Sequence, residues 1–409
     1  MIGYLRFVRR NGRFLLFGLL AAALSGFGQT FYIGVFGGVL RADFGLSHGQ
    51  YGLIYSLATL GSGLLVAWAG GWIDRMPLAR FVTGVSLGVA AGCLVMASAT
   101  SAAALVLGLF LLRFCGQGLF MHTASTSMAR HFEAHRGKAV SIASKGLPLA
   151  EAVMPAAGVA LIGLVGWRTT WWFSAGAMVA VFLPLLLWLL RGRVRVESGD
   201  ADGDGREGAA RPRRRQWTRG EVLRDLRFYR ILPVVLAPPF VMTAMVFHLA
   251  QLAADKGWSL EALAGAFTGF AAAHVLGLLV SGILLDRLGA RPMLRVFLLP
   301  MLVGLLLIAT LDHPLLAWVF MSLMGLSIGG AGTLLGALWP VLYGTTHLGA
   351  IRAMVHAAMV LSTAITPVTV GLGLDAGLGM EAVALALAVY IVVALGVSWG
   401  ALPRATGTG

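Results

Sequence analysis

Long apolar segments, separated by short polar breaks, follow one another along the whole chain. We place them at residues 14–40, 50–73, 79–99, 102–126, 138–165 and 168–190 and, after a long polar stretch, at 229–252, 260–285, 292–311, 315–342, 350–374 and 379–402. About 20 residues are enough for a helix to cross the hydrocarbon core of a bilayer. The pattern therefore predicts an all-α membrane protein with twelve transmembrane helices, arranged as six plus six.

The composition of the chain argues against most classes of soluble protein. Of its 409 residues, 58% are apolar and 12% are charged, whereas soluble domains carry about 25% charged residues. A soluble enzyme, a disordered chain and a nucleic-acid-binding protein are all poor fits, despite the net charge of +14. Cys93 and Cys115 both lie in apolar segments, so we expect no disulfide, no metal and no cofactor.

Basic residues indicate the orientation of the chain in the membrane. If the N-terminus is cytoplasmic, the loops on the other side carry three basic residues, Arg41, Arg168 and Lys256. Arg113 and Lys145 lie within apolar segments, which leaves 26 of the 31 basic residues on the cytoplasmic side. Because loops rich in Lys and Arg stay in the cytoplasm, we expect both termini there. The expected protein is a multi-pass monomer of a bacterial inner membrane.

Residues 191–228 form the one long polar stretch. We interpret them as a cytoplasmic linker between an N-terminal six-helix bundle, residues 1–190, and a C-terminal six-helix bundle, residues 229–409. The acidic run at 197–205 superficially resembles a calcium loop but lacks a bidentate glutamate at the right distance. The basic run at 211–215 is suited to contact with anionic lipid headgroups.

An internal repeat relates the two halves of the chain. The sequence Gly70-Gly-Trp-Ile-Asp74-Arg75 recurs as Gly282-Ile-Leu-Leu-Asp286-Arg287-Leu-Gly289-Ala-Arg291, at an offset of 212 residues between the aspartates. The same offset pairs Gly137 with Gly349 and Pro155 with Pro367. Three landmarks at one offset indicate a duplicated six-span unit, which is a recurrent design of secondary transporters.

The repeated loop, Gly-x3-Asp-Arg-x-Gly-x-Arg, resembles the signature of the major facilitator superfamily. The sequence Arg113-Phe-Cys-Gly116-Gln-Gly118 resembles the second motif of that family. This resemblance implies two pseudo-symmetric six-helix bundles and a secondary transporter, not an enzyme, that works by alternating access. The first copy of the loop departs from the pattern, because Pro77 stands where glycine is usual.

The charged residues of the repeated loop are candidates for a gate. An aspartate at a helix end can bind a basic side chain and cap a neighbouring helix, and such contacts can lock helix ends together in one state of a transport cycle. We therefore assign gating, rather than substrate binding, to the following residues: Asp74, Arg75, Asp286, Arg287 and Arg291. The alternative is that the loop only anchors the topology.

Three charged residues lie inside apolar segments, where ionisable groups are costly and indicate function. At 1.5 Å per residue, Arg113 lies roughly 17 Å from the outer end of its segment, and Glu151 roughly 20 Å from the inner end of its own. Because the two segments form a hairpin, we expect an Arg113–Glu151 pair, either as a proton-coupling switch or as a structural ion pair. Lys145, roughly 10 Å into its segment, either snorkels to the surface or offers its charge to an anion.

Histidines and uncharged polar residues complete the candidate site for substrate and protons. Histidine can bind a proton or a carboxylate, but a single histidine in a span is often a hydrogen-bonded packing residue. The candidates are His248, His274, His356, Gln29, Tyr32 and Thr363. Gln29 and Tyr32 are three residues apart and would share one face of a helix. The histidine spacings form no metal site.

Two loops suggest a branch within the family. Residues 129–144 and 343–352 are similar to the monocarboxylate and oxalate/formate carriers, although the segment at 260–285 lacks the arginine that members of that branch use for the carboxylate. We therefore expect proton-coupled transport of a small organic anion. Because residues 150–158 partly match the motif of drug exporters, efflux of a drug-like or amphiphilic compound is the alternative.

Overall fold

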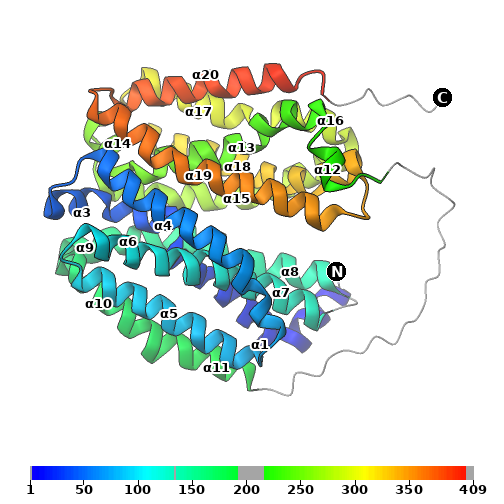
Figure 1. Ribbon diagram of the computed structural model, residues 1–409, viewed down its shortest axis with the longest axis horizontal. Helices are drawn as coiled ribbons and strands as arrows, with labels where there is room; N and C mark the ends of the chain where they lie inside the picture. The colour runs from blue at the N-terminus through cyan, green and yellow to red at the C-terminus, as the bar shows by residue number, and fades with distance from the viewer. Residues whose placement is uncertain (1, 133–134, 192–215, 402–409) are drawn as a thin grey trace. The chain divides into compact units, whose positions relative to one another are not determined.

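The computed structural model describes residues 2–132, 135–191 and 216–401 (Figure 1). In this part of the chain all regular secondary structure is helical, and twelve stretches are long and apolar enough to cross a membrane. They are Phe7–Gly28, His48–Asp74, Leu78–Ser98, Ala102–His131, Arg136–Val165, Trp167–Leu190, Leu226–Phe247, Leu260–Leu288, Ala290–Thr310, Leu316–Tyr343, Leu348–Asp375 and Met380–Ser398. The predicted fold class is confirmed.

Contacts divide the chain into two compact units. Unit 1 takes Met1–Asp204 and Val246–Ala250, and unit 2 takes Gly205–Met245 and Gln251–Gly409. Residues 192–215, which include the acidic and basic runs of the expected linker, lie outside the described residues.

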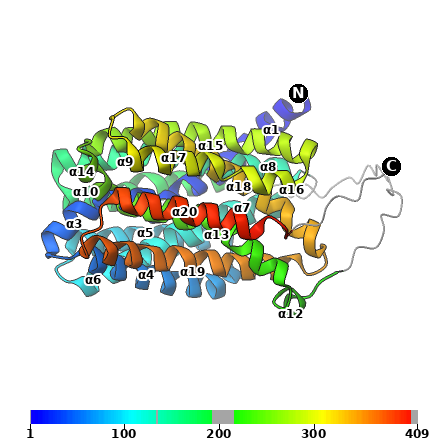
Figure 2. The same cartoon turned by 90° about the horizontal axis from the view of Figure 1, so that it is seen from above.

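The helices of unit 1 belong to the first six spans. They are α1 (Ile2–Leu24), α2 (Thr30–Ile33), α3 (Gly37–Phe44), α4 (His48–Ala69), α5 (Leu78–Ser98), α6 (Ala102–Leu111), α7 (Met121–His131), α8 (Arg136–Ser144), α9 (Gly146–Val165), α10 (Trp167–Ala177) and α11 (Leu183–Leu190). Short segments of other helix types join them. Three are 3₁₀ helices, η1 (Ser25–Gly28), η2 (Gly34–Phe36) and η3 (Gly70–Asp74), and two are π-helices, η4 (Leu112–Phe120) and η5 (Met178–Phe182). Helix α1 packs against α7, α8 and α9, and α5 packs against α6 and α10 (Figures 1 and 2).

The first span is not one continuous helix, contrary to our expectation for residues 14–40. Helix α1 passes into the 3₁₀ segment η1, and Gln29 then has extended backbone, with φ −83° and ψ 151°. Glycine and serine in the sequence Ser25-Gly-Phe-Gly28 are weak helix formers. The break leaves carbonyl groups at the end of η1 without a helical partner, so they can accept hydrogen bonds from side chains.

The helices of unit 2 belong to the last six spans. They are α12 (Arg219–Val222), α13 (Leu226–Phe247), α14 (Leu249–Lys256), α15 (Leu260–Leu288), α16 (Ala290–Val296), α17 (Leu299–Thr310), α18 (Leu316–Tyr343), α19 (Leu348–Asp375) and α20 (Met380–Ser398). Helix α15 packs along α18, and α17 contacts both α18 and α20 (Figure 2).

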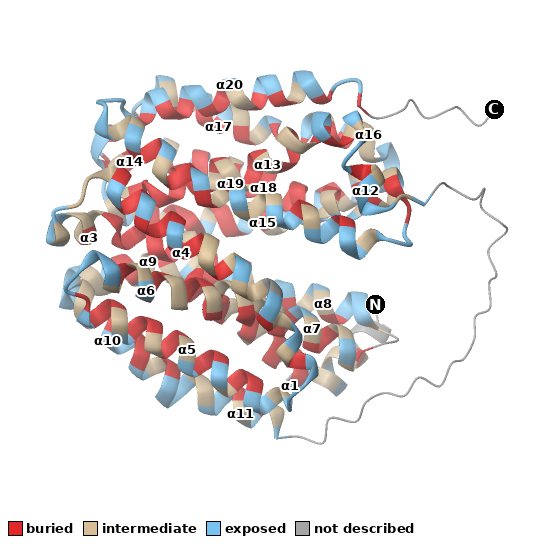
Figure 3. Cartoon of the chain, viewed as in Figure 1, coloured by how far each residue is buried: buried red, intermediate tan, exposed pale blue. Residues whose placement is uncertain are grey.

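Burial alternates around the helices of each unit (Figure 3). The faces turned inward carry buried aromatic clusters, such as Phe36 stacked on Trp171 at 4.5 Å between ring centroids. The outward faces carry large apolar side chains, including Leu64 and Leu164, which are 77% and 80% exposed. A surface this apolar is suited to lipid rather than water.

The offset of 212 also relates two turns that the sequence analysis did not use. Asp43-Phe-Gly45-Leu-Ser47 corresponds to Asp255-Lys-Gly257-Trp-Ser259. Gly45 and Gly257 have φ of 60° and 61°, in the left-handed region where glycine commonly ends a helix. Ser47 and Ser259 each accept a backbone N–H of the next helix and cap its N-terminus. The repeat thus extends to the turns between the first two spans of each half.

One basic residue in unit 1 joins three of its loops. Arg168 donates to the carbonyl oxygens of Ala97 (3.2 Å) and Ala99 (2.7 Å) and pairs with Asp43 at 2.9 Å. It also lies over the Trp167 ring, 4.2 Å from the centroid. Arg168 therefore ties the start of the sixth span to the turns after the first and third spans.

Lys256 joins the corresponding loops of unit 2. Its Nζ lies 2.5 Å from both Asp312 Oδ1 and Glu381 Oε1 and 3.2 Å from the Leu311 carbonyl oxygen. Burial by itself would lower the pKa of Lys256, but hydrogen bonds to Asp312 and Glu381 raise it overall. The hydrogen bond from Lys256 holds the pKa of Asp312 below its usual value. Two of the three basic residues expected in the outer loops thus hold loops together.

Candidate functional site

Arg113 is buried in the interior of unit 1. Its side chain belongs to η4, a π-helical segment in the middle of the fourth span, and the residue is only 3% exposed. Its Nη1 donates to the Tyr55 hydroxyl at 2.6 Å and to the Gly28 carbonyl oxygen at 3.3 Å. The guanidinium carbon also lies 4.8 Å from the centroid of the Tyr55 ring. The Tyr55 hydroxyl in turn lies 2.7 Å from Thr30 Oγ1.

Close packing between the break in the first span and η4 creates this arrangement. A Cβ atom at Gly116 would lie 2.8 Å from the Gly28 nitrogen, and a Cβ at Gly28 would overlap the backbone of Leu112 and Gln117. Only glycines allow the two backbones to come this near. The carbonyl of Gly28, released by the break, is then within reach of Arg113. A π-helical turn is a frequent feature of functional sites.

The groups that accept hydrogen bonds from Arg113 are electrically neutral. Nη1 is bonded to a carbonyl and a phenol, while Nε is buried and has no hydrogen-bond partner among the described residues. Our expectation of an Arg113–Glu151 pair is wrong, because the guanidinium turns instead toward Gly28 and Tyr55. A buried charge without a counter-charge is costly, so the site is suited to an incoming anion.

Glu151 and Lys145 lie at different depths on the fifth span. Glu151 belongs to α9 and is 5% exposed. Lys145 is exposed and stands between α8 and α9. Of the two residues expected to accompany Arg113, Glu151 is therefore buried and Lys145 is not.

The expectation that Gln29 and Tyr32 share one face of a continuous helix is wrong, because Gln29 lies at the break. Tyr32 is buried, with its hydroxyl 3.4 Å from Ser174 Oγ. Its ring packs edge-on against Trp171 at 5.5 Å. Tyr32 thus packs against α10 within unit 1.

The histidines are distributed over the chain. His248 is buried between α13 and α14, in the short segment that groups with unit 1, and its ring lies 6.0 Å from that of His48. His274 is buried in α15 at its closest approach to α18, where a Cβ on Gly329 would overlap the His274 carbonyl oxygen.

The candidates on α19 are more accessible than His274. His356 is exposed, while Thr363 is half-buried and donates to the Val360 carbonyl at 2.9 Å. Among the described residues no group of three His, Cys, Asp or Glu side chains could hold a metal ion.

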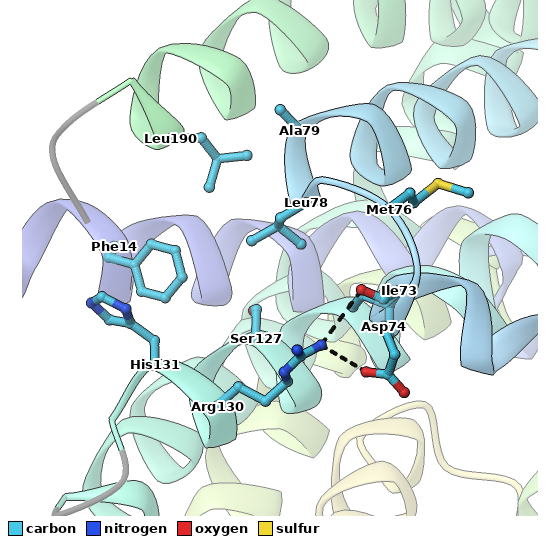
Figure 4. Close-up of a pocket in the computed structure, with 10 residues that line it drawn as sticks. All are labelled: Phe14, Ile73, Asp74, Met76, Leu78, Ala79, Ser127, Arg130, His131 and Leu190. Atoms are coloured by element: carbon cyan, nitrogen blue, oxygen red, sulfur yellow. Dashed lines mark hydrogen bonds and ion pairs between the residues drawn. The ribbon is translucent and has the colours of Figure 1, made fainter. Parts of the chain in front are cut away.

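The two copies of the gating loop differ in their contacts. Asp74 Oδ1 accepts from Arg130 Nη1 at 2.6 Å, and the same Nη1 lies 3.5 Å from the Ile73 carbonyl oxygen (Figure 4). Both charged side chains are more than half exposed, and exposed ion pairs contribute about 0–1 kcal/mol to stability. The offset places Leu342 where Arg130 stands in the first copy, and Asp286 forms no ion pair within the described ranges.

The basic residues of the loops are also placed differently. Arg75 and Arg287 are exposed, while Arg291 is half-buried and its Nε has no hydrogen-bond partner in the described part of the chain. On the fourth span, His122 Nε2 donates to the Gly70 carbonyl at 2.9 Å. His122 and Arg130 therefore hold the segment that carries Asp74 at both of its ends.

Comparison with known families decides the class of the protein. The model of the Major Facilitator Superfamily matches residues 18–367. The chain belongs to this superfamily. No match is found among curated proteins. As a Major Facilitator Superfamily member it is a transporter, as the paired loop motif predicted.

Solved structures agree with this membership. A bacterial homolog of the human lysosomal transporter Spinster, inward-facing and occupied, is 17% identical with a TM-score of 0.71, covering 95% of this chain and 96% of that chain. A mutant of the nucleoside transporter NupG is 14% identical with a TM-score of 0.72, covering 95% and 100%. At such low identity the two structures support the fold alone.

Sequence reasoning missed three partners in this Major Facilitator Superfamily member. Tyr55 and Thr30 contact each other, Tyr55 contacts Arg113, and Arg130 contacts Asp74. Arg130 stands 17 residues after Arg113 in the same span, so a search along that span for a partner of Asp74 could have found it. No local signal in the sequence pairs Tyr55 with Arg113, because that contact depends on the break at Gly28.

Proposed function

We propose that this transporter moves a small, monocarboxylate-like organic anion by alternating access, coupled to protons, and that Arg113 binds the charged group of the anion. The observation that carries the proposal is the buried guanidinium of Arg113, whose hydrogen-bond acceptors among the described residues are both neutral. An anion beside it would supply the missing counter-charge. The likeness of residues 129–144 and 343–352 to monocarboxylate carriers points to the same substrate class.

The geometry of the guanidinium favours a carboxylate. Nη1 is occupied by Tyr55 and Gly28, which leaves the edge formed by Nε and Nη2. Two parallel N–H groups on one edge match the two oxygens of a carboxylate, and such bidentate pairs are strong and directional. Tyr55 and Gly28 would hold the plane of the guanidinium in place while the other edge receives the substrate.

Proton coupling is assigned to Glu151. It is an acidic residue buried in the same unit as Arg113, on the span that follows. A carboxyl group in such a position can carry a proton in one step of the cycle and release it in another, because burial and the charge of a bound anion act on it together. We also propose that both termini face the cytoplasm of a bacterial cell, on the count of basic residues.

A binding screen tests the proposed substrate class. Purified protein in detergent is heated with monocarboxylates, dicarboxylates, nucleosides and lipophilic cations, and the unfolding temperature is recorded. A carboxylate is expected to stabilise the wild type and the exposed-residue control Arg136→Gln. Arg113→Gln should weaken its binding about thirtyfold or more, because truncating one partner of a buried charge pair costs at least about 2 kcal/mol.

Two results would overturn the proposal. Stabilisation by lipophilic cations alone would favour drug efflux, the alternative function. Equal binding of the carboxylate by the wild type and Arg113→Gln would remove Arg113 from the site. Arg113→Lys should give intermediate binding, since an ammonium keeps the charge but loses the bidentate edge.

A further inference from the structure

Unit 1 contains a cavity whose lining does not include Arg113. Its volume is about 470 Å³, within the range of roughly 300–1,000 Å³ that small-molecule sites occupy. It lies between the first residues of the first and third spans and the last residues of the second, fourth and sixth. All of these are at the end of unit 1 that carries the N-terminus, and the ends of spans are where we expect the bilayer to meet water.

The lining of this cavity is divided by polarity (Figure 4). Arg130, Asp74 and Ser127 lie on one side. The other side is apolar and includes Leu78, Ala79 and Leu190. A ligand that fits such a lining has a polar head at one end and a hydrocarbon portion at the other.

The polar side of the cavity offers hydrogen-bond donors beside the Arg130–Asp74 ion pair. A guanidinium has five N–H donors, and the hydrogen bonds of Arg130 within the described residues use Nη1 alone. Nε and Nη2 are therefore available to acceptor oxygens. Arg9, Arg10 and Arg13 are exposed on α1, in the same end of the unit. Basic residues near the membrane surface attract anionic lipids by about 1 kcal/mol each.

The apolar side of the cavity includes Leu190, the last residue of the sixth span. Leu190 lines the cavity, and Trp188, two residues earlier, is 53% exposed. The Arg13 guanidinium lies 4.4 Å from the centroid of the Trp188 ring and donates to the Trp188 carbonyl. Arg13 thus places a positive charge at the end of the sixth span, where Leu190 forms part of the apolar lining.

We propose that this cavity binds an anionic phospholipid, with the phosphate at Arg130 and one acyl chain along Leu78, Ala79 and Leu190. Asp74 already offsets the charge of Arg130, so the preference for an anionic over a zwitterionic headgroup comes from the exposed Arg9, Arg10 and Arg13 at the same end of the unit. The apolar half of the lining selects a lipid over a free phosphate ion. The site is independent of the proposed substrate site at Arg113.

The proposal is tested by thermal unfolding of the delipidated, full-length protein in detergent. The additives are a phosphatidylglycerol, a phosphatidylcholine with the same acyl chains, and inorganic phosphate. Phosphatidylglycerol is expected to stabilise the wild type more than phosphatidylcholine does, and phosphate alone is expected to have no effect. In Arg130→Gln the apparent affinity for phosphatidylglycerol should fall about tenfold, because charge-assisted hydrogen bonds are lost.

Two further variants keep the test decisive. Ala79→Phe should fill the apolar half and weaken phosphatidylglycerol binding while leaving the Arg130–Asp74 pair intact. Lys138→Gln removes one exposed positive charge outside the cavity and should bind like the wild type. The proposal is overturned if Arg130→Gln and Ala79→Phe keep the full preference for phosphatidylglycerol, or if phosphate alone reproduces the stabilisation.

Discussion

Replacing Gly28 with alanine should disturb both the stability of unit 1 and the position of Arg113. The new Cβ would lie closer than 3.0 Å to the Leu112 carbonyl oxygen and to the Gln117 backbone nitrogen, whereas ordinary contacts begin at 3.4 Å. Both atoms belong to backbone, so no side-chain rotation relieves the overlap. The first span or η4 must move by about 1 Å, and the carbonyl that accepts from Arg113 moves with it.

The size of the effect follows from the overlap. Overpacking a closely packed interior costs about 1–3 kcal/mol. In a unit of this size that corresponds to a fall of roughly 2–12 °C in unfolding temperature. The fall is measured by thermal unfolding in detergent, and the binding of the best carboxylate from the screen is measured on the same samples. Binding is expected to weaken, because Arg113 loses one of the two groups that hold it.

Gly84→Ala is the matched control for this experiment. Gly84 lies in α5, and an added Cβ there meets no atom within 4 Å. The substitution should stabilise the protein slightly, by up to about 1 kcal/mol, because alanine is a better helix former than glycine. If Gly28→Ala were as stable as Gly84→Ala and bound the carboxylate as tightly as the wild type, the close contact between the first span and η4 would be wrong.

Three further predictions concern other parts of the chain. Lys256→Gln should lower the unfolding temperature by roughly 2–4 °C. In unfolding scans across pH, the difference from wild type should shrink in acid, as pH falls through the lowered pKa of Asp312, and in alkali, as pH rises through the raised pKa of Lys256. Asp74→Asn should change initial uptake rates more than Asp286→Asn, because in the part of the chain that the structure describes Asp74 forms an ion pair and Asp286 does not. Equal rates and equal cysteine labelling from both faces would contradict the gate. Glu151→Gln should abolish uptake driven by a pH gradient but retain exchange in proteoliposomes, and undiminished proton-driven uptake would eliminate Glu151 as the carrier.

The periodic features of this chain were predictable from sequence. Apolar length alone located the twelve spans, because a bilayer requires long helices whatever their packing. The offset of 212 paired Asp74 with Asp286 and Pro155 with Pro367, since a duplication keeps its register when no gap intervenes. The burial of Arg113 was also predictable, because the residue stands far from both ends of a long apolar segment.

The partners of Arg113 were not predictable from the same rules. Helical geometry pointed to Glu151 on the neighbouring span, on the assumption of regular helices. The break at Gly28 and the π-helical η4 change the register on both sides of the contact, and Tyr55 becomes the nearest acceptor. The same assumption misplaced Gln29 relative to Tyr32. Departures from regular helical geometry therefore account for both wrong predictions, the Arg113–Glu151 pair and the shared face of Gln29 and Tyr32.

The most direct test of the account is the flux of a carboxylate through proteoliposomes that contain Arg113 variants. Counterflow of the carboxylate identified by the screen is compared for wild type, Arg113→Lys, Arg113→Gln and the control Arg136→Gln. The account predicts wild-type flux for Arg136→Gln, reduced flux for Arg113→Lys and none above empty vesicles for Arg113→Gln. Wild-type flux with an unchanged half-saturating concentration in Arg113→Gln would contradict it.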